Sequence, residues 1–184
     1  MGARWTLKAL AYLLVITNLT AWAIADDALL VEDIESAVIL EMHVNHLKAP
    51  IRSRVELERH LATGDSPIYA LSDGARELFL ESLVFGENGL ASFRKAELEA
   101  ELTPTQIYEI LSLFGFQGAI TGFGNARIET QEDLKLLSTS TAGNVLTSGR
   151  CGQYVEGRCW SAATCKVTLN YCCSPPHCPG RQIP

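Results

Sequence analysis

Six cysteines lie close together near the end of this 184-residue sequence, and the 150 residues before them contain none. Thiols at this density form disulfide bonds, bind a metal ion or act as nucleophiles. Their spacing, C-x7-C-x5-C-x6-CC-x4-C, lacks the C-x2-C pair of small zinc domains, and their even number leaves no thiol over. We therefore predict three disulfide bonds, and with them an oxidising compartment, for Cys151, Cys159, Cys165, Cys172, Cys173 and Cys178.

The cysteine spacing leaves two questions open. The sequence does not choose among the pairings, except that the adjacent Cys172 and Cys173 should bond to different partners, because a bridge between neighbours is strained. A zinc site built from cysteines together with His177 is the alternative to disulfide bonds.

Three histidines earlier in the chain raise the question of a metal site. His43 and His46 lie three residues apart on a predicted helix, with Glu41 close by, and this spacing brings side chains to one face. His60, with Glu56 on the next predicted helix, would add the ligands that a metal ion needs. A metal-dependent periplasmic enzyme is therefore the one enzymatic alternative. In the other interpretation, these histidines line the edge of an acidic helical surface.

No other pattern in the sequence supports catalysis. The chain contains no G-x-S-x-G, H-E-x-x-H, phosphate-binding loop or dinucleotide fingerprint. Glu97, Glu99 and Glu101 form an acidic run without an evident buried partner, so we expect a solvated helix face rather than a general acid. The sequence thus favours a protein without enzymatic activity and implies no cofactor.

The first 25 residues have the layout of a secretory signal peptide. Arg4 and Lys8 precede an apolar run, and Ala23 and Ala25 offer small residues for cleavage. An uncleaved anchor is the alternative, although the run is short for crossing a hydrocarbon core of ~30 Å. We expect a secreted or periplasmic protein with no transmembrane span after cleavage.

The rest of the chain divides into two parts of opposite charge. The sequence carries −6 in total, with −11 for residues 26–149 and +3 for residues 150–184. This balance argues against nucleic-acid binding across the whole surface. A stretch rich in Ser, Thr and Gly separates the two parts. We expect an acidic helical domain over residues 26–137, a linker over residues 138–149 and a cationic, cysteine-rich tail over residues 150–184.

Apolar periodicity and capping residues predict that the first part is mainly α, a small helical bundle. The clearest start is at Thr103, a capping residue that precedes Pro104 in the first helical turn. Residues 116–124 favour a tight turn or a short strand, and the tail favours loops with a strand at residues 166–171. The predicted helices cover residues 27–48, 53–62, 72–85, 93–102, 103–114 and 129–137.

The tail alternates cationic with aromatic side chains on a scaffold that disulfide bonds would hold rigid. Such side chains suit adhesion to anionic surfaces such as phospholipid headgroups or acidic glycans. The predicted surface-binding residues are Arg150, Arg158, Lys166, Tyr154, Trp160 and Tyr171.

The last 34 residues resemble the general plan of secreted cysteine-rich effector peptides, including defensin-like and knottin-like toxins. Gly149-Arg150-Cys151 and Gly157-Arg158-Cys159 each match the G-x-C turn of these peptides. The resemblance implies an effector peptide and does not extend further into the chain.

Two functions from different classes fit these observations. In the first, a secreted two-part protein carries a cationic, disulfide-rich effector or surface-binding peptide on an acidic helical domain, which presents it or releases it by cleavage at Arg150. In the second, the chain is a non-enzymatic envelope or extracellular binding module, and the tail is a structural staple. The expected partner is an anionic surface or another protein, and no nucleic acid.

Overall fold

A computed structural model of the chain describes residues 36–138 and 151–180. The chain divides into two compact units, Met1–Leu40 and Glu41–Pro184. The described residues of the first unit, 36–40, are helical, and helical residues continue in the second unit from 41 to 48. The predicted signal peptide with its cleavage residues Ala23 and Ala25, nearly all of the predicted linker, and Arg150 lie outside the described residues.

Helices dominate the chain before the cysteine-rich tail, as the sequence predicts. Residues 116–124, predicted as a turn or strand, instead contain a 3₁₀-helix, in which the N–H groups of Ala119 and Phe123 bond to carbonyl oxygens three residues earlier. The elements of this region are α2 (Arg54–Leu61), η1 (Pro67–Ala70), α3 (Asp73–Ser82), α4 (Ala96–Glu101), α5 (Pro104–Ser112), η2 (Gln117–Gly122) and α6 (Gln131–Ser138).

Capping side chains explain where three of these helices begin. The hydroxyls of Ser53, Ser72 and Thr103 accept hydrogen bonds from backbone N–H groups at the starts of α2, α3 and α5. At α5 the side chain of Gln106 also accepts a bond from the Thr103 N–H, 3.0 Å away. These bonds satisfy donors that have no partner inside the helix, and they confirm the predicted starts.

A β-hairpin interrupts the helices, so the fold is mixed helix and sheet rather than purely helical. Strand β1 (Val84–Gly86) pairs antiparallel with β2 (Gly89–Arg94), and Glu87 with Asn88 connects them. The predicted helices over residues 72–85 and 93–102 are wrong where they overlap this hairpin. The prediction of strands in the tail alone is wrong for the same reason.

The tail carries four short strands and the 3₁₀-helix η3 (Pro175–His177). The predicted strand over residues 166–171 is wrong, because β5 ends and β6 begins at its two limits, and Asn170 between them has a positive φ of 64°. The strands are β3 (Val155–Glu156), β4 (Arg158–Ser161), β5 (Thr164–Lys166) and β6 (Tyr171–Cys173).

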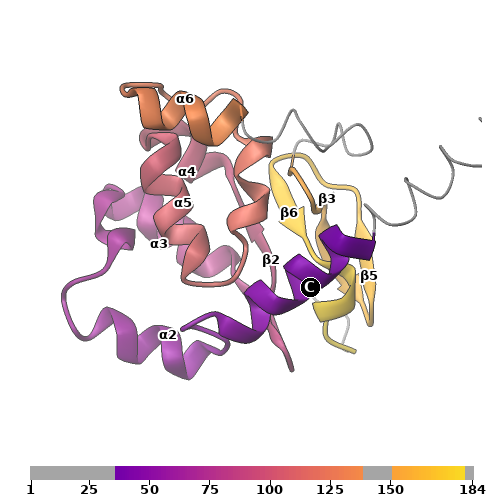
Figure 1. The fold of residues 1–184 in the computed structure, drawn as a ribbon. Helices are drawn as coiled ribbons and strands as arrows, with labels where there is room; N and C mark the ends of the chain where they lie inside the picture. The colour runs from indigo at the N-terminus through magenta and orange to yellow at the C-terminus, as the bar shows by residue number, and fades with distance from the viewer. Residues whose placement is uncertain (1–35, 139–150, 181–184) are drawn as a thin grey trace, which may run out of the picture. The chain divides into compact units, whose positions relative to one another are not determined.

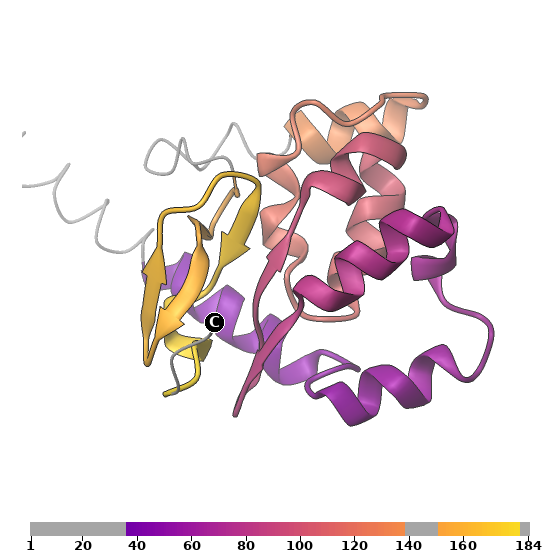
Figure 2. The same cartoon turned by 180° about the vertical axis from the view of Figure 1, so that it is seen from behind.

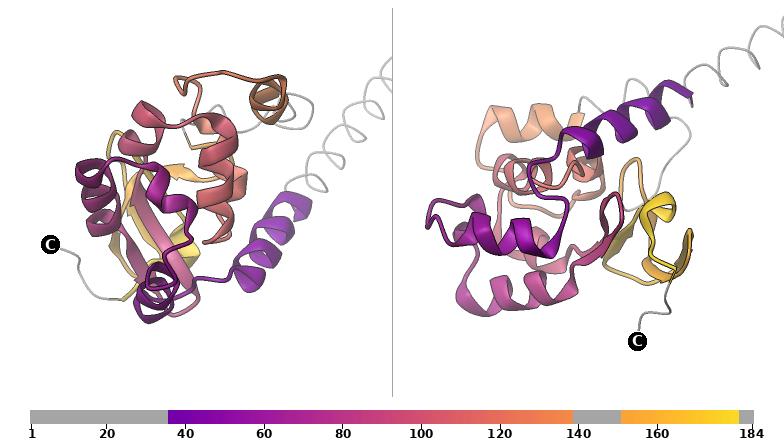
Figure 3. Two further views of the ribbon diagram at one scale, coloured as in Figure 1. Left: turned by 90° about the vertical axis from the view of Figure 1, so that its left-hand side faces the viewer. Right: turned by 90° about the horizontal axis from the view of Figure 1, so that it is seen from below.

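One sheet joins the tail to the chain that precedes it. Its strand order is β1-β2-β6-β3, while β4 and β5 form a separate two-stranded sheet. Strand β2 pairs with β6 from Ser92 opposite Cys173 to Arg94 opposite Tyr171. Figures 1 and 2 show β2 between the helices and the tail strands, and the left view of Figure 3 shows the tail strands behind the helices.

The hydrophobic core also extends into the tail. Buried phenylalanines from α3, β2 and the region around α5 pack with Cys151, Tyr154 and Cys172 in the main cluster. A smaller cluster combines Ala91 of β2 with tail cysteines. The tail is therefore packed against the helical region through side chains as well as through the β2–β6 ladder.

Candidate functional site

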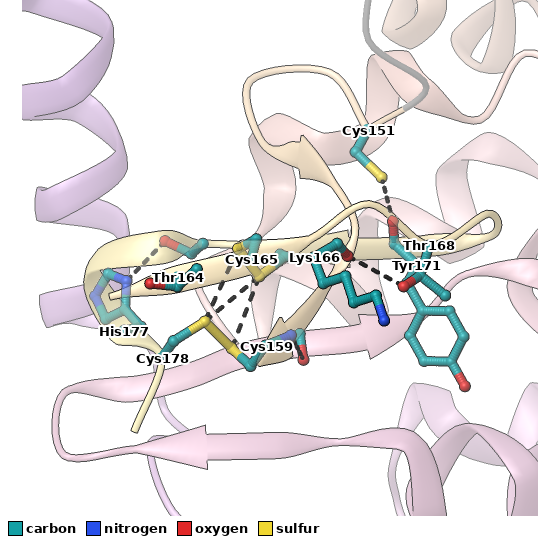
Figure 4. The surroundings of a disulfide bond; sticks show 12 residues. Cys151, Cys159, Thr164, Cys165, Lys166, Thr168, Tyr171, His177 and Cys178 are labelled. Atoms are coloured by element: carbon teal, nitrogen blue, oxygen red, sulfur yellow. Dashed lines mark hydrogen bonds between the residues drawn. A yellow bond between two sulfur atoms is a disulfide. The ribbon is translucent and has the colours of Figure 1, made fainter. Parts of the chain in front are cut away.

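The six tail cysteines form three disulfide bonds, as predicted. The adjacent Cys172 and Cys173 have different partners, also as predicted. One bond lies in the main core and the other two lie in the smaller cluster, where Figure 4 shows their sulfur atoms close together. The pairs are Cys151–Cys172, Cys159–Cys178 and Cys165–Cys173.

The two-stranded sheet has one buried face and one face open to solvent. Arg158 pairs with Lys166 and Cys159 pairs with Cys165, and paired residues leave an antiparallel sheet on the same side. The cysteines therefore define the inner face and the two cations the outer one. The Lys166 ammonium lies 4.6 Å from the centre of the Trp160 ring, which places Trp160 on the outer face as well.

Large apolar side chains are exposed on this outer face and in the loop that follows it. Trp160 is 48% exposed, and in the loop after β5 Val167 is 77% and Leu169 is 63% exposed. Together with Arg158 and Lys166 these residues make up what we call the tail face. Exposed apolar patches mark binding surfaces, and the tail face is the candidate for one in the tail.

Two of the predicted surface-binding residues do not belong to the tail face. Tyr154 is only 5% exposed, and its hydroxyl donates a hydrogen bond to the Gly115 carbonyl oxygen at 3.0 Å, so its predicted place at the surface is wrong. Burial of the ring raises the pKa of Tyr154, and the charge of Glu41 adds to this shift. Tyr171 lies in a pocket beside the tail face.

This pocket lies where the end of α3 meets the hairpin and the tail strands. Its volume is about 380 Å³, within the size range of small-molecule sites. Its lining combines aliphatic side chains with two guanidinium groups, a phenol and a carboxylate. The lining residues are Leu78, Glu81, Ser82, Leu83, Val84, Arg94, Arg158 and Tyr171.

Bonds to its neighbours fix the position of Arg94 in the pocket wall. Its Nε atom donates to both carboxylate oxygens of Glu97, at 2.7 and 2.9 Å, and its Nη2 atom donates to the same carboxylate. The bond to Glu97 raises the pKa of Arg94, as does the neighbouring Tyr171. The Arg94 backbone N–H donates to the Ser82 hydroxyl at 2.9 Å, which ties β2 to the end of α3.

The acidic run Glu97, Glu99 and Glu101 is not a solvated face, contrary to the prediction. Glu97 is buried against Arg94, and Glu99 lies 3.3 Å from the Lys95 ammonium. The Glu101 carboxylate accepts bonds from the hydroxyl and the N–H of Ser72, which lower its pKa. All three carboxylates accept bonds from neighbouring groups, and Glu97 and Glu99 are largely shielded from water.

The histidines meet in a combination that the sequence did not predict. His60 bonds through Nε2 to the Ser66 hydroxyl at 3.1 Å. His46 stacks instead on His177 of the tail, with ring centres 4.0 Å apart and an angle of 11° between the planes. The separation of 131 positions between them in the sequence explains why no local pattern indicated this pair.

Burial favours the neutral form of both stacked rings. His46 is 2% exposed, its Nδ1 donates to the Met42 carbonyl oxygen at 2.9 Å, and its buried Nε2 has no hydrogen-bond partner. Burial lowers the pKa of His46 although the Met42 bond opposes the shift, and the charge of His43 lowers it further. Burial, followed by the charges of His46 and His43, lowers the pKa of His177 to about 4.

The predicted metal sites are not preassembled in the described residues. The proposed set of His43, His46 and His60 does not bring three ligand atoms within 4.8 Å of one another. Within the described part of the chain, the one group that does so consists of Cys159, Cys173 and Cys178, whose sulfur atoms are all in disulfide bonds. Disulfide sulfur is not the thiolate that zinc binds.

A buried carboxylate that the sequence analysis missed connects the last two helices. Asp133 in α6 accepts bonds from the N–H and hydroxyl of Thr105, at 3.0 and 2.7 Å, and from the same two groups of Thr130. Burial alone would raise the pKa of Asp133, but these bonds lower it. The pattern Thr130-x-x-Asp133 was the available sequence signal, because it has the spacing of a capping box.

Comparisons with known proteins identify no relative of this chain. No family model, no curated protein and no solved structure matches it. None of the helices in the described residues is long and apolar enough to cross a membrane. Interpretation of the site therefore rests on the geometry of the chain itself.

Proposed function

We propose that this chain is a secreted, disulfide-stabilised binding protein that attaches to anionic phospholipid surfaces through its tail face. The observation that carries this proposal is the exposure of Trp160, Val167 and Leu169 beside the cations Arg158 and Lys166. Aromatic and aliphatic side chains enter the boundary between headgroups and acyl chains, while cations bind the anionic headgroups.

The three disulfide bonds support both the location and the mode of binding. They fit an oxidising compartment outside the cytosol. They also fix the strands that carry Trp160 and Lys166, so little conformational freedom is lost when the tail face binds.

The shared sheet favours presentation of the tail over its release. Cleavage at Arg150 would free a segment whose strand β6 pairs with β2 and whose Ser174 N–H bonds to the Ala91 carbonyl oxygen at 2.8 Å. Separation would break these bonds and expose Cys151 and Cys172 of the main core. We therefore propose that the acidic helical domain holds and presents the cationic tail.

The same contacts also support the alternative that the tail is a structural staple of a binding module that acts elsewhere. The bonds between β2 and β6 and the buried Cys151–Cys172 bridge serve stability under either function. The exposed side chains of the tail face distinguish the two, since a staple does not need them.

Co-sedimentation with lipid vesicles tests the proposal. We expect binding to vesicles of phosphatidylcholine with phosphatidylglycerol, little binding to phosphatidylcholine alone, and weaker binding as salt rises. Trp160→Ala and Leu169→Ala should each weaken binding several-fold, whereas Leu134→Ala on α6, a position with 52% exposure, should not. Equal effects at Leu169 and Leu134, or binding to heparin in place of vesicles, would overturn the phospholipid proposal.

A further inference from the structure

We infer that the pocket between α3, β2 and the tail strands binds the phosphate group of an anionic phospholipid. This inference rests on the proposed function, because it names the lipid chemistry that the tail face recognises. The pocket is formed by residues from three parts of the chain, so it exists only when the tail is packed on the hairpin.

The donors that line the pocket suit a phosphate group. Arg94 and Arg158 supply guanidinium groups and Tyr171 a hydroxyl. Arginine presents planar, permanently charged donors that match phosphate oxygens. Glu97 binds Nε and Nη2 of Arg94, so this guanidinium is held in one orientation in the pocket wall.

The aliphatic lining residues suit the rest of a lipid molecule. They are Leu78, Leu83 and Val84, and Leu78 is 45% exposed. A pocket that combines guanidinium groups with aliphatic side chains fits an amphiphile better than an inorganic ion.

An arginine offsets the negative charge at the carboxyl end of α3. A helix carboxyl end carries a partial negative charge, but Arg54 donates from Nη1 and Nη2 to the carbonyl oxygens of Leu80 and Leu83, at 3.0 and 2.9 Å. The carboxylate of Glu81 remains as the one acidic lining residue of the pocket. Glu81 therefore weakens the binding of an anionic ligand. Its replacement by glutamine should have the opposite effect to the loss of an arginine and increase affinity.

The pocket is continuous with the tail face through Arg158. Arg158 lines the pocket and pairs in register with Lys166, whose ammonium lies over Trp160. Figure 4 shows the side chains of Lys166 and Tyr171 pointing away from the sulfur atoms of the tail. A lipid bound by its phosphate in the pocket thus lies beside the apolar side chains that enter the bilayer.

Vesicles with two kinds of anionic lipid test this inference on the full chain. One set contains phosphatidylcholine with phosphatidic acid, and the other contains phosphatidylcholine with oleic acid, adjusted to the same surface potential. We expect the wild type to bind the phosphatidic acid vesicles about tenfold more tightly, as hydrogen bonds to a charged group imply. Equal affinity for both sets would overturn the inference.

Variants separate the pocket from the tail face. Arg158→Gln and the pocket-filling Leu78→Trp should each abolish the preference for phosphatidic acid, and Glu81→Gln should increase affinity for it. Leu78 is exposed, so the second variant tests the pocket even where loss of an arginine disturbs folding. Lys166→Gln should weaken binding to both vesicle sets equally and retain the preference. A preference that survives both pocket variants would overturn the inference.

Two further results separate the sources of phosphate and the two proposals. Saturable binding of glycerol 3-phosphate in solution, without a preference for phosphatidic acid vesicles, would overturn the lipid source and assign the pocket to a soluble phosphate compound. Loss of the preference in Arg158→Gln while Trp160→Ala still binds every vesicle normally would support the pocket and overturn the role of the tail face.

Discussion

Gly86 shows how a single hydrogen atom allows the tail to pack on the hairpin. A Cβ atom at this position would overlap the carbonyl oxygen of His177, which belongs to the backbone and cannot rotate away. We expect Gly86→Ala to destabilise the protein by about 1–3 kcal/mol, the usual cost of overpacking. Urea unfolding followed by circular dichroism measures the change.

A second glycine in the same region supplies the matched control for Gly86→Ala. A Cβ at Gly74 in α3 would meet nothing within 4 Å. Gly74→Ala should therefore stabilise the protein by about 0.5–1 kcal/mol, because alanine costs less entropy than glycine in a helix. Equal effects of the two substitutions would contradict the close approach of His177 to β1.

The stacked pair of His46 and His177 makes stability depend on pH. Burial lowers the pKa of His177 from 6.5 to about 4, so between these values the unfolded chain binds a proton that the folded chain does not. The contribution of neutral His177 to the free energy of unfolding is therefore fully present above pH 6.5. It is lost as the pH decreases toward 4, by about 1–3 kcal/mol. The lowered pKa of His46 acts in the same direction.

Replacement of one ring by a ring that does not titrate tests this dependence. We expect His177→Phe to keep a stacked ring and to show a smaller loss of stability between pH 7 and pH 4.5 in urea titrations. His60→Gln, which leaves both stacked rings in place, is the control. An unchanged pH dependence in His177→Phe would contradict the assignment to this pair.

At the scale of elements, local signals determined what the sequence could predict. Thr103 with Pro104 and Gln106 is a complete local signal for a helix start, and the structure confirms it. The hairpin also had a local signal, because the dipeptide Asn88-Gly89 is typical of hairpin turns; in the structure Glu87 and Asn88 form the turn, and Gly89, with a positive φ of 128°, begins β2. It was missed because the apolar spacing of Leu78, Leu83 and Phe85 was interpreted as one continuous helix.

Contacts distant in sequence account for the parts of the candidate site that could not be predicted. The cysteines and the cations of the tail were found from local composition. The pocket required the register that places Arg94 opposite Tyr171, and the histidine pair required the packing of His177 in η3 on His46. Neither the register nor this packing is encoded by the spacing of neighbouring residues.

Asp133 connects two elements, since it lies in α6 and binds Thr105 at the start of α5. Asp133→Asn keeps one acceptor oxygen but places an amide N–H group among donors, so we expect a loss of about 1–3 kcal/mol. Because these bonds lower the pKa of Asp133, its contribution is present above pH 4 and is lost as the pH falls further.

The neighbouring acid gives a direct comparison with Asp133. Glu132 is an exposed residue whose carboxylate lies 3.9 Å from the Lys135 ammonium. Glu132→Gln should change the free energy of unfolding at pH 7 by less than about 0.5 kcal/mol. A similar cost for both substitutions in urea unfolding would refute the special role of Asp133.

At the scale of the whole molecule, the shared sheet and core predict that the helical region and the tail unfold together. In protein prepared from residue 26 onward, Trp160 is the only tryptophan, so its fluorescence reports on the tail, while far-ultraviolet circular dichroism reports mainly on the helices. We expect the two urea transitions to coincide, because the β2–β6 ladder and the main core include both regions.

The bridge between Cys151 and Cys172 extends this prediction to a variant. It closes a separation of 21 residues inside the tail, yet its sulfur atoms lie in the core that the helices share. Replacement of both cysteines by alanine should lower the free energy of unfolding by about 2–4 kcal/mol and shift both transitions to the same lower urea concentration. If the fluorescence transition moved alone, the tail would be an independent folding unit, and its release from the helical domain would again be the better explanation of the opposite charges.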